Sequence, residues 1–187
     1  MTLSAGVEKF NSECFPAMEE KFRELEKGQS PETLFITCSD SRIDPSLMTQ
    51  TEPGELFVIR NAGNIVPKPG TGELSVEATI LYAIDVLKVK RVVVCGHSHC
   101  GAVTGLMNLD SLNELPEIKA WVGKSAEVLD RLESDTSTLN DGIKENVKLQ
   151  LEHLLEFPSV SKAVAANELE LEGWLYHFES GHVEFLD

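Results

Sequence analysis

The sequence lacks long apolar runs and has few basic residues. No stretch approaches the ~20 consecutive apolar residues that a membrane-spanning helix needs, so we expect no membrane span. The first residues, MTLSAGVEKFNSEC, contain neither a basic segment nor an apolar core, so we expect no secretory signal. Lysine and arginine number 16 against 31 aspartates and glutamates, a formal net charge of −15. This balance argues against nucleic acid and anionic membranes as partners.

Cysteine is scarce as well. Four cysteines in 187 residues cannot form a disulfide-dense framework. A reducing compartment fits better, so we expect a cytoplasmic protein, or one in an organelle or microcompartment lumen reached without a visible signal. Reduced cysteines are available for metal binding or catalysis. Internal repeats and low-complexity tracts are also missing, and the length predicts one domain with or without appendages.

Residues 3–28 have the apolar pattern of a helix. Their apolar side chains recur every three or four positions and so form one stripe. The stripe consists of Phe10, Cys14, Met18, Phe22 and Leu25. We expect Pro16 to divide the helix and Gly28 to end it. A helical arm this long, ahead of the first strand, is expected to pack on a partner chain.

Three short runs rich in β-branched residues predict strands at 34–38, 55–63 and 91–97. None alternates cleanly, so we expect each strand to be covered on both faces, as in a parallel sheet. The intervening segment 72–89 predicts a helix that is apolar nearly all round and therefore buried. Strand, helix and strand at this spacing form a βαβ unit with a right-handed crossover.

The rest of the chain is mostly helical in pattern. We expect a helix directly after Cys100 and two amphipathic helices at 117–133 and 142–156, with linkers at 110–116 and 134–142. Near the end, 170–178 and 182–187 read as a hairpin joined by residues 179–181. The fold class expected is α/β. It consists of a mostly parallel central sheet flanked by helices, with an antiparallel hairpin at its edge.

Three potential metal ligands follow the ends of predicted strands. Cys38 ends the first strand, and His97 and Cys100 lie at the end of another, in the string CGHSHCG. Sites in open α/β sheets form at the carboxyl ends of the strands. Two thiolates and an imidazole suit tetrahedral zinc, and three protein ligands leave a fourth position open. An open fourth position is typical of a catalytic zinc site.

Other assignments of these residues remain open at this point. The three could be unrelated buried residues, because free cysteine is often buried. His99 is the alternative ligand, although His-x-x-Cys spacing favours His97. Cys95 lies within an apolar run and is expected in the core. Gly101 begins the helix after the ligand turn, where its N–H could point toward an anion.

Charged and amide side chains lie next to the predicted ligands. Asp40 can accept a hydrogen bond from a metal-bound water, and Arg42 can fork onto Asp40 and keep it ionised. An ordinary ion pair in a loop is the alternative. Arg60, Asn61 and Asn64 are candidates for holding the loops together.

Three motifs resemble those of the β-class carbonic anhydrases, in the same order and at similar separations. They are CSDSRIDP (38–45), ELFVIRNAGN (55–64) and VVVCGHSHCGAV (92–103). The similarity extends from about Gln29 to Thr104, and GWLYHFESGHV (173–183) resembles the closing strand pair of that family. The resemblance implies one domain over 1–187, with an N-terminal helical arm at 1–28 and an α/β core at 29–187.

The resemblance also implies roles by position. Cys38, His97 and Cys100 match the zinc ligands, and Asp40 and Arg42 match the Asp–Arg dyad of the family. The implied enzyme is a carbonic anhydrase (carbonate dehydratase), a zinc lyase. It would hydrate carbon dioxide reversibly to bicarbonate and a proton, by attack of zinc-bound hydroxide.

Four further matches concern the substrate pocket of the plant-type subgroup: Gln29, Phe57, Tyr82 and Gly101. In that subgroup the first three would come from the neighbouring chain, so the implied assembly is a homodimer or a higher homo-oligomer. Its active sites would lie at the dimer interface, and its N-terminal helices would embrace the partner.

Two other functions fit the same ligands. A related zinc hydrolase could act on another cumulated small molecule, such as carbon disulfide. A non-catalytic module could instead use structural zinc, with the fourth position closed by Asp40, Cys95 or His99.

Overall fold

The computed structural model describes residues 2–133 and 136–186, which form two compact units. One unit comprises the residues up to Ser30, and the other begins at Pro31. Asp187, the last residue of the predicted hairpin, lies outside the described residues, as do two residues of the predicted linker at 134–142. Among the described residues, no helix is both long and apolar enough to cross a bilayer.

The first unit is helical, as predicted for 3–28. It consists of α1 (Leu3–Lys9), a π-helical segment η1 (Phe10–Cys14), α2 (Phe15–Ala17) and α3 (Glu19–Leu25). The break falls at Met18 rather than at Pro16. Pro16 lies in α2, directly after the π-helical segment η1, within a helical run that is unbroken from Leu3 to Ala17. Phe10 and Phe15 contact each other, with ring centroids 6.2 Å apart, and both remain partly exposed.

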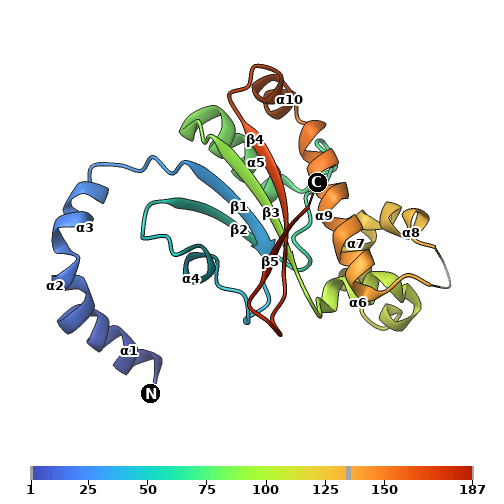
Figure 1. Ribbon diagram of the computed structural model, residues 1–187, viewed down its shortest axis with the longest axis horizontal. Coiled ribbons are helices and arrows are strands. Elements are labelled where there is room, and N and C mark those ends of the chain that lie inside the picture. The colour runs from blue at the N-terminus through green and yellow to red at the C-terminus, as the bar shows by residue number, and fades with distance from the viewer. Residues whose placement is uncertain (1, 134–135, 187) are drawn as a thin grey trace. The chain divides into compact units, whose positions relative to one another are not determined.

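The second unit contains a five-stranded sheet (Figure 1). Its strands are β1 (Thr33–Cys38), β2 (Leu56–Asn61), β3 (Arg91–His97), β4 (Glu170–Tyr176) and β5 (Val183–Leu186). Their order across the sheet is β2-β1-β3-β4-β5. All neighbouring pairs are parallel except β4 and β5, which form the antiparallel hairpin. The predicted fold class is therefore confirmed.

The strands in the middle of the sheet are buried on both faces, as predicted, but the strand at its edge is not. Every residue of β1 and β3 after the first is buried, whereas β2 is largely exposed or half-buried. Because β2 lies at the edge of the sheet, the prediction that it is covered on both faces is wrong. Val58, in the middle of β2, is 40% exposed.

The helix between β2 and β3 is not buried all round, so that prediction is also wrong. It comprises α5 (Leu74–Leu81) and a π-helical segment η2 (Tyr82–Leu87). Ile80 and Ile84 pack into the core, while Leu74 and Val86 point away from it and are exposed. The helix therefore packs on the core of this unit on one side only.

Helices after Cys100 differ in detail from the prediction. They are α6 (Gly101–Met107), α7 (Pro116–Val122), α8 (Glu127–Arg131), α9 (Leu139–Leu155) and α10 (Pro158–Ala165), with short 3-10 turns at Leu109–Leu112 and Gly123–Ser125. The single helix predicted at 117–133 is broken at the second of these turns. Helix α9 begins before residue 142, because Thr138 and Asp141 form a capping box. Helix α10 and the short α4 (Pro45–Thr49) were not predicted.

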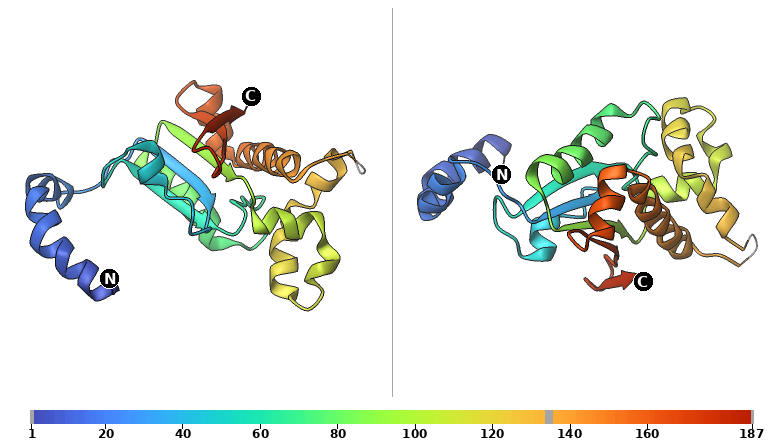
Figure 2. Two further views of the ribbon diagram at one scale, coloured as in Figure 1. Left: turned by 60° about the horizontal axis from the view of Figure 1, so that its bottom comes forward. Right: turned by 90° about the horizontal axis from the view of Figure 1, so that it is seen from above.

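Helix α9 packs closely on β3 and β4, and glycines make this possible (Figure 2). A Cβ added at Gly96 would lie 2.8 Å from Cγ2 of Ile143 and 2.9 Å from Cγ2 of Val147. Gly173 in β4 meets Val147 at 3.0 Å in the same way. Strands β3 and β4 therefore lie directly against the side of α9 that carries Ile143 and Val147.

Candidate metal centre

Cys38, His97 and Cys100 come together at the carboxyl ends of β1 and β3. Cys38 is the last residue of β1, His97 is the last residue of β3, and Cys100 precedes the first turn of α6. Their potential ligand atoms all lie within 4.8 Å of one another, and all three residues are buried. We refer to these three residues as the Cys-His-Cys cluster.

The ring of His97 is oriented to offer one nitrogen to the sulfurs. Its Nδ1 lies 2.9 Å from the carbonyl oxygen of Ser98, to which it donates a hydrogen bond. Nε2 is buried and has no hydrogen-bond partner in the described chain. A buried polar atom without a partner is costly unless something binds it. His97 is therefore arranged to bind a cation through Nε2.

A hydrogen bond between the two cysteines of the cluster shifts their pKa values in opposite directions. The pKa of Cys38 is lowered, chiefly by a hydrogen bond from the Cys100 thiol, and further by His97 and by the Gly63 N–H, whose nitrogen lies 3.3 Å from Sγ. The same bond and burial raise the pKa of Cys100. Two buried sulfurs this close cannot both carry a negative charge unless a cation balances them. This donor set fits a divalent metal that accepts soft ligands, such as zinc.

Cys95 and His99, the neighbours considered as alternative ligands, do not join the cluster. Cys95 is not among the residues whose ligand atoms converge; it packs beside Phe35 and Val93, and burial raises the pKa of its thiol to about 12. His99 has a left-handed backbone, with φ of 56°, and its exposed side chain faces Glu179. The geometry thus brings His97 rather than His99 to the two sulfurs, which is the choice that the His-x-x-Cys spacing favoured.

Asp40 and Arg42 form a fixed pair beside the cluster. Arg42 donates from Nε to Oδ1 of Asp40 at 2.9 Å and from Nη2 to Oδ2 at 2.7 Å. These bonds hold the pKa of Asp40 well below its usual range, so its carboxylate stays ionised at neutral pH. Oδ2 lies 3.9 Å from Nε2 of His97. A charged hydrogen-bond acceptor is therefore aimed at the space next to the potential ligands.

Arg60 and Asn61, considered as residues that hold loops, do so. Arg60 donates to the carbonyl oxygens of Cys38 and Asp40, at 3.0 and 2.7 Å. Asn61 makes two hydrogen bonds to the backbone of Ile65, which close the loop after β2. That loop contains the Gly63 N–H that contacts Cys38.

A buried polar network on α9 supports the same loop, and sequence analysis missed it. Asn146 donates to the carbonyl oxygen of Gly63 at 3.0 Å. Gln150 accepts from the Val66 N–H at 2.8 Å and donates to Asn146 and to Ser125. Both amide side chains are almost completely buried. Polar residues at helical spacing on the core-facing side of α9 were the signal that could have revealed this network.

The C-terminal hairpin supplies a second group of contacts that sequence analysis missed. The ring of Phe178 lies against that of His97, with ring centroids 4.8 Å apart. The guanidinium carbon of Arg42 also lies over the Phe178 ring, 4.6 Å from its centroid. Ser98 donates to Glu179 at 2.8 Å and accepts from the Phe178 N–H at 2.9 Å. The hairpin thereby fixes the turn that contains His97.

The four residues expected in the substrate pocket are spread over the chain. Phe57 and Tyr82 contact each other, with ring centroids 5.9 Å apart. Phe57 lies four residues before Asn61, the register partner of Cys38, which places it ~13 Å along the strand from the cluster. Gly101 is the first residue of α6. Gln29 belongs to the first unit.

Comparison with known proteins gives concordant results. The family model described as carbonic anhydrase matches residues 33–183. A carbonic anhydrase of Pseudomonas aeruginosa is 42% identical over 187 residues, which cover 97% of this chain and 85% of the relative. The structure of the β-carbonic anhydrase CcaA matches with a TM-score of 0.93 and 38% identity, over 98% of this chain and 97% of that one.

This chain also matches a solved structure that is described as one of two tetrameric β-carbonic anhydrases from the filamentous ascomycete Sordaria macrospora. The TM-score is 0.77 and the identity 30%, over 98% of this chain and 96% of that one. These similarities extend over the Cys-His-Cys cluster and over both ends of the sheet.

Proposed function

This chain belongs to the β class of the carbonic anhydrase family, and we propose that its Cys-His-Cys cluster holds the zinc ion for reversible hydration of carbon dioxide. One observation carries the proposal: a buried, unpartnered Nε2 of His97 faces two sulfurs beside an ionised carboxylate. When bound, zinc acidifies a water molecule and so supplies a nucleophile at neutral pH. The reaction class is that of a lyase.

The donor set suits this chemistry. Cys38 and Cys100 would hold zinc as thiolates and His97 through Nε2, and the two thiolates would balance the two positive charges of the ion. Three protein ligands are typical of catalytic zinc, whereas structural zinc takes four. The N–H of Gly63 stabilises the negative charge on Cys38.

Asp40 orients the attacking oxygen. Its carboxylate accepts a hydrogen bond from that oxygen and so turns a lone pair toward the carbon of carbon dioxide. Arg42 keeps Asp40 ionised and holds both of its oxygens in place. Asp40 therefore acts on the substrate directly, and Arg42 acts as a positioning residue.

A second copy of the chain completes the substrate pocket in this proposal. Gln29, Phe57 and Tyr82 of one copy would line the site of the other, and the Gly101 N–H would donate to a substrate oxygen. The distance of Phe57 from the cluster in its own chain supports this arrangement, as does the partial exposure of Tyr82. The helical arm of residues 1–28 would embrace the partner.

The subgroup, assembly and location are part of the same proposal. Gln29 favours the plant-type subgroup, and β1 contains no tryptophan of the kind that a non-plant-type bicarbonate site requires. The tetramers of Sordaria macrospora support a homo-oligomer. Cys38 and Cys100 must stay reduced to bind a metal, which fits the cytoplasm.

Stopped-flow measurement of carbon dioxide hydration across pH tests the proposal. The purified protein should contain one zinc per chain, lose activity with a chelator and regain it when zinc returns. Stoichiometric zinc without hydration activity would identify a structural metal and refute the proposal. A parallel rate measurement with carbon disulfide separates the related hydrolase, which would prefer that substrate.

A further inference from the structure

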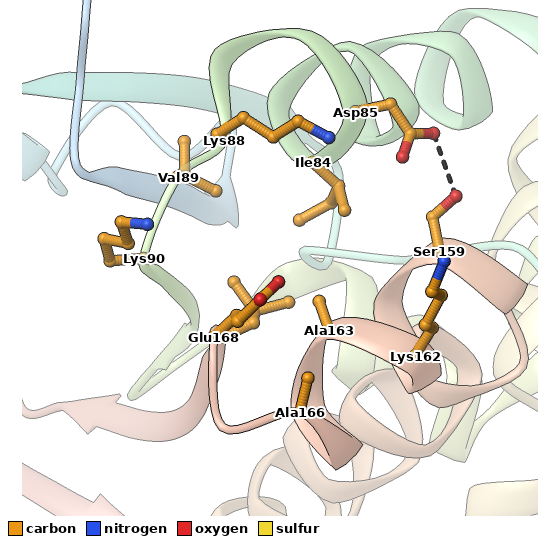
Figure 3. Close-up of a pocket in the computed structure, with 11 residues that line it drawn as sticks. Ile84, Asp85, Lys88, Val89, Lys90, Ser159, Lys162, Ala163, Ala166 and Glu168 are labelled. Carbon is orange, nitrogen blue, oxygen red and sulfur yellow. Dashed lines mark hydrogen bonds between the residues drawn. The ribbon is translucent and has the colours of Figure 1, made fainter.

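A cavity of about 280 Å³ lies at the end of the sheet opposite to the Cys-His-Cys cluster. It opens between the end of η2, the start of β3 and one side of α10 (Figure 3). Its floor is apolar and consists of the buried side chains of Ile84, Val89 and Leu169. No residue assigned to catalysis contributes to it.

Three lysines line this cavity: Lys88, Lys90 and Lys162. Lys88 follows η2, Lys90 directly precedes β3, and Lys162 belongs to α10 (Figure 3). Within the described part of the chain, none of their ammonium groups makes an ion pair or a hydrogen bond. Every other lysine and arginine has such a partner. In a chain with a formal net charge of −15, the cations without partners are thus gathered around one cavity.

The nearby acids do not neutralise these lysines. Asp85 accepts a hydrogen bond from Ser159 at 2.9 Å instead of pairing with a lysine. Glu168 also lines the cavity and makes no ion pair among the described residues. Three positive and two negative side chains leave the lining with an excess of one positive charge. The surroundings therefore attract an anion and also offer carboxylates that can accept hydrogen bonds from a ligand.

We propose that this cavity binds a small phosphate-class dianion, either inorganic phosphate or the monoester of a small metabolite. Lysine ammonium groups are common phosphate ligands and act as point charges. The volume lies just below the range of ~300–1,000 Å³ that is usual for drug-sized ligands, so the occupant is small. Nucleic acids and other large polyanions are excluded, because the rest of the strongly acidic surface repels them.

Binding is expected to be weak. Lys88 follows the last residue of η2 and Lys162 lies in the last turn of α10, where each also offsets the partial negative charge of a helix end. All three lysines are exposed to solvent, which weakens each attraction to an anion. We expect a dissociation constant in the millimolar range.

Phosphorus NMR titration of the zinc-loaded full-length protein tests the proposal, with inorganic phosphate and glycerol 3-phosphate as probes at constant ionic strength. The triple variant Lys88→Gln, Lys90→Gln, Lys162→Gln should weaken binding of at least one probe by about tenfold or more. The control variant removes the same charge from paired lysines elsewhere: Lys119→Gln, Lys124→Gln, Lys148→Gln. It should change the dissociation constant less than twofold. A probe that binds at the zinc centre instead would bind equally well to both triple variants, so the two binding sites are distinguished.

A single substitution of opposite sign sharpens the test. Asp85→Asn removes a competing negative charge and should tighten binding at least twofold. Equal affinities in the two triple variants, weaker binding in Asp85→Asn, or no saturable binding to the wild-type protein would each overturn the proposal. The tighter of the two probes tells whether the free ion or a monoester is the ligand. Circular dichroism verifies that each variant is folded.

Discussion

The two ends of the central sheet differ in how their polar and charged side chains are held. At the carboxyl ends of β1 and β3, sulfur, imidazole and carboxylate groups are crowded together, and neighbouring side chains and N–H groups hold them in place. Near the amino end of β3, the exposed side chains of Lys88, Lys90 and Lys162 line a cavity, and none of them forms an ion pair within the described part of the chain. The same strand connects both ends. The difference shows that buried polar groups in this protein are held by hydrogen bonds, whereas exposed ammonium groups need no partner within the protein.

Burial explains much of this contrast. An unpaired charge in the interior is costly, so every charged group at the catalytic end needs a partner or a metal. An exposed lysine loses little by remaining unpaired in water. Substitutions at the catalytic end should therefore have far larger effects than matched substitutions elsewhere in the sheet.

The largest effect is expected from Cys38→Ala. Without one of three ligands the cluster should lose its zinc, and the rate of carbon dioxide hydration should fall by roughly 1,000-fold or more. Elemental analysis and stopped-flow assays measure both quantities. Cys95→Ala is the matched control, because Cys95 is also a buried cysteine of the sheet but does not belong to the Cys-His-Cys cluster. Full activity in Cys38→Ala would remove the basis of the assignment.

A smaller loss is expected from Asp40→Asn. The amide keeps the shape of the carboxylate but lacks its charge, so the turnover rate should fall about 100-fold while zinc is retained. Glu170→Gln is the matched control at the other end of the sheet, where Arg91 binds a carboxylate that is exposed. Its activity should equal that of the wild type. Similar losses in both variants would show that general electrostatics, not orientation by Asp40, matters.

Gln150→Leu tests the support of the catalytic end. The substitution leaves the buried Val66 N–H and Oδ1 of Asn146 without the partner that Gln150 provides, which should cost about 2 kcal/mol of stability. The thermal midpoint should then fall by about 4–8 °C at equal protein concentration. Ser159→Ala, which removes an exposed hydrogen bond to Asp85, should lower stability by less than about 0.5 kcal/mol. If the two variants are equally stable, the buried network of Gln150 contributes no more to the free energy of unfolding than the exposed hydrogen bond of Ser159.

The smallest effect concerns pH. The pKa of Asp40 is lower in the folded than in the unfolded protein, so its contribution to stability is complete above the unfolded value near ~4 and is lost as pH falls below it. Because Arg42 is half exposed, we expect a contribution of only about 1 kcal/mol. Denaturant unfolding of wild type and Asp40→Asn should show a stability gap at pH 7 that narrows toward pH 3. A gap that is constant with pH would contradict this account.

Local sequence patterns were sufficient for the sheet and for the cluster. Runs of β-branched residues marked β1 and β3, and parallel strands necessarily bring their carboxyl ends to one edge. Patterns were less successful for surfaces, because exposure depends on what covers an element. The helix at 72–89 has an apolar composition all round, but its outer face, with Leu74 and Val86, is uncovered in this chain.

Sequence patterns also failed to predict where α9 begins and where the helix expected at 117–133 is interrupted. The segment 134–142 contains residues typical of a linker, and the same residues, Thr138 and Asp141, cap the start of α9. The apolar pattern of 117–133 is continuous, but Gly123–Ser125 forms a tighter turn within it. Both errors concern helix boundaries, which depend on a few hydrogen bonds rather than on the periodicity of a segment.

By itself the sequence determined the residue types of the metal centre, their order and their places after predicted strands, because these depend on spacing along the chain. Only the tertiary structure decided that His97 rather than His99 faces the sulfurs, and that Asn146 and Gln150 support the loop of Gly63. It alone brought Lys88 and Lys162 to one cavity. The direction of a side chain and its burial depend on segments far apart in sequence, which meet only when the chain packs.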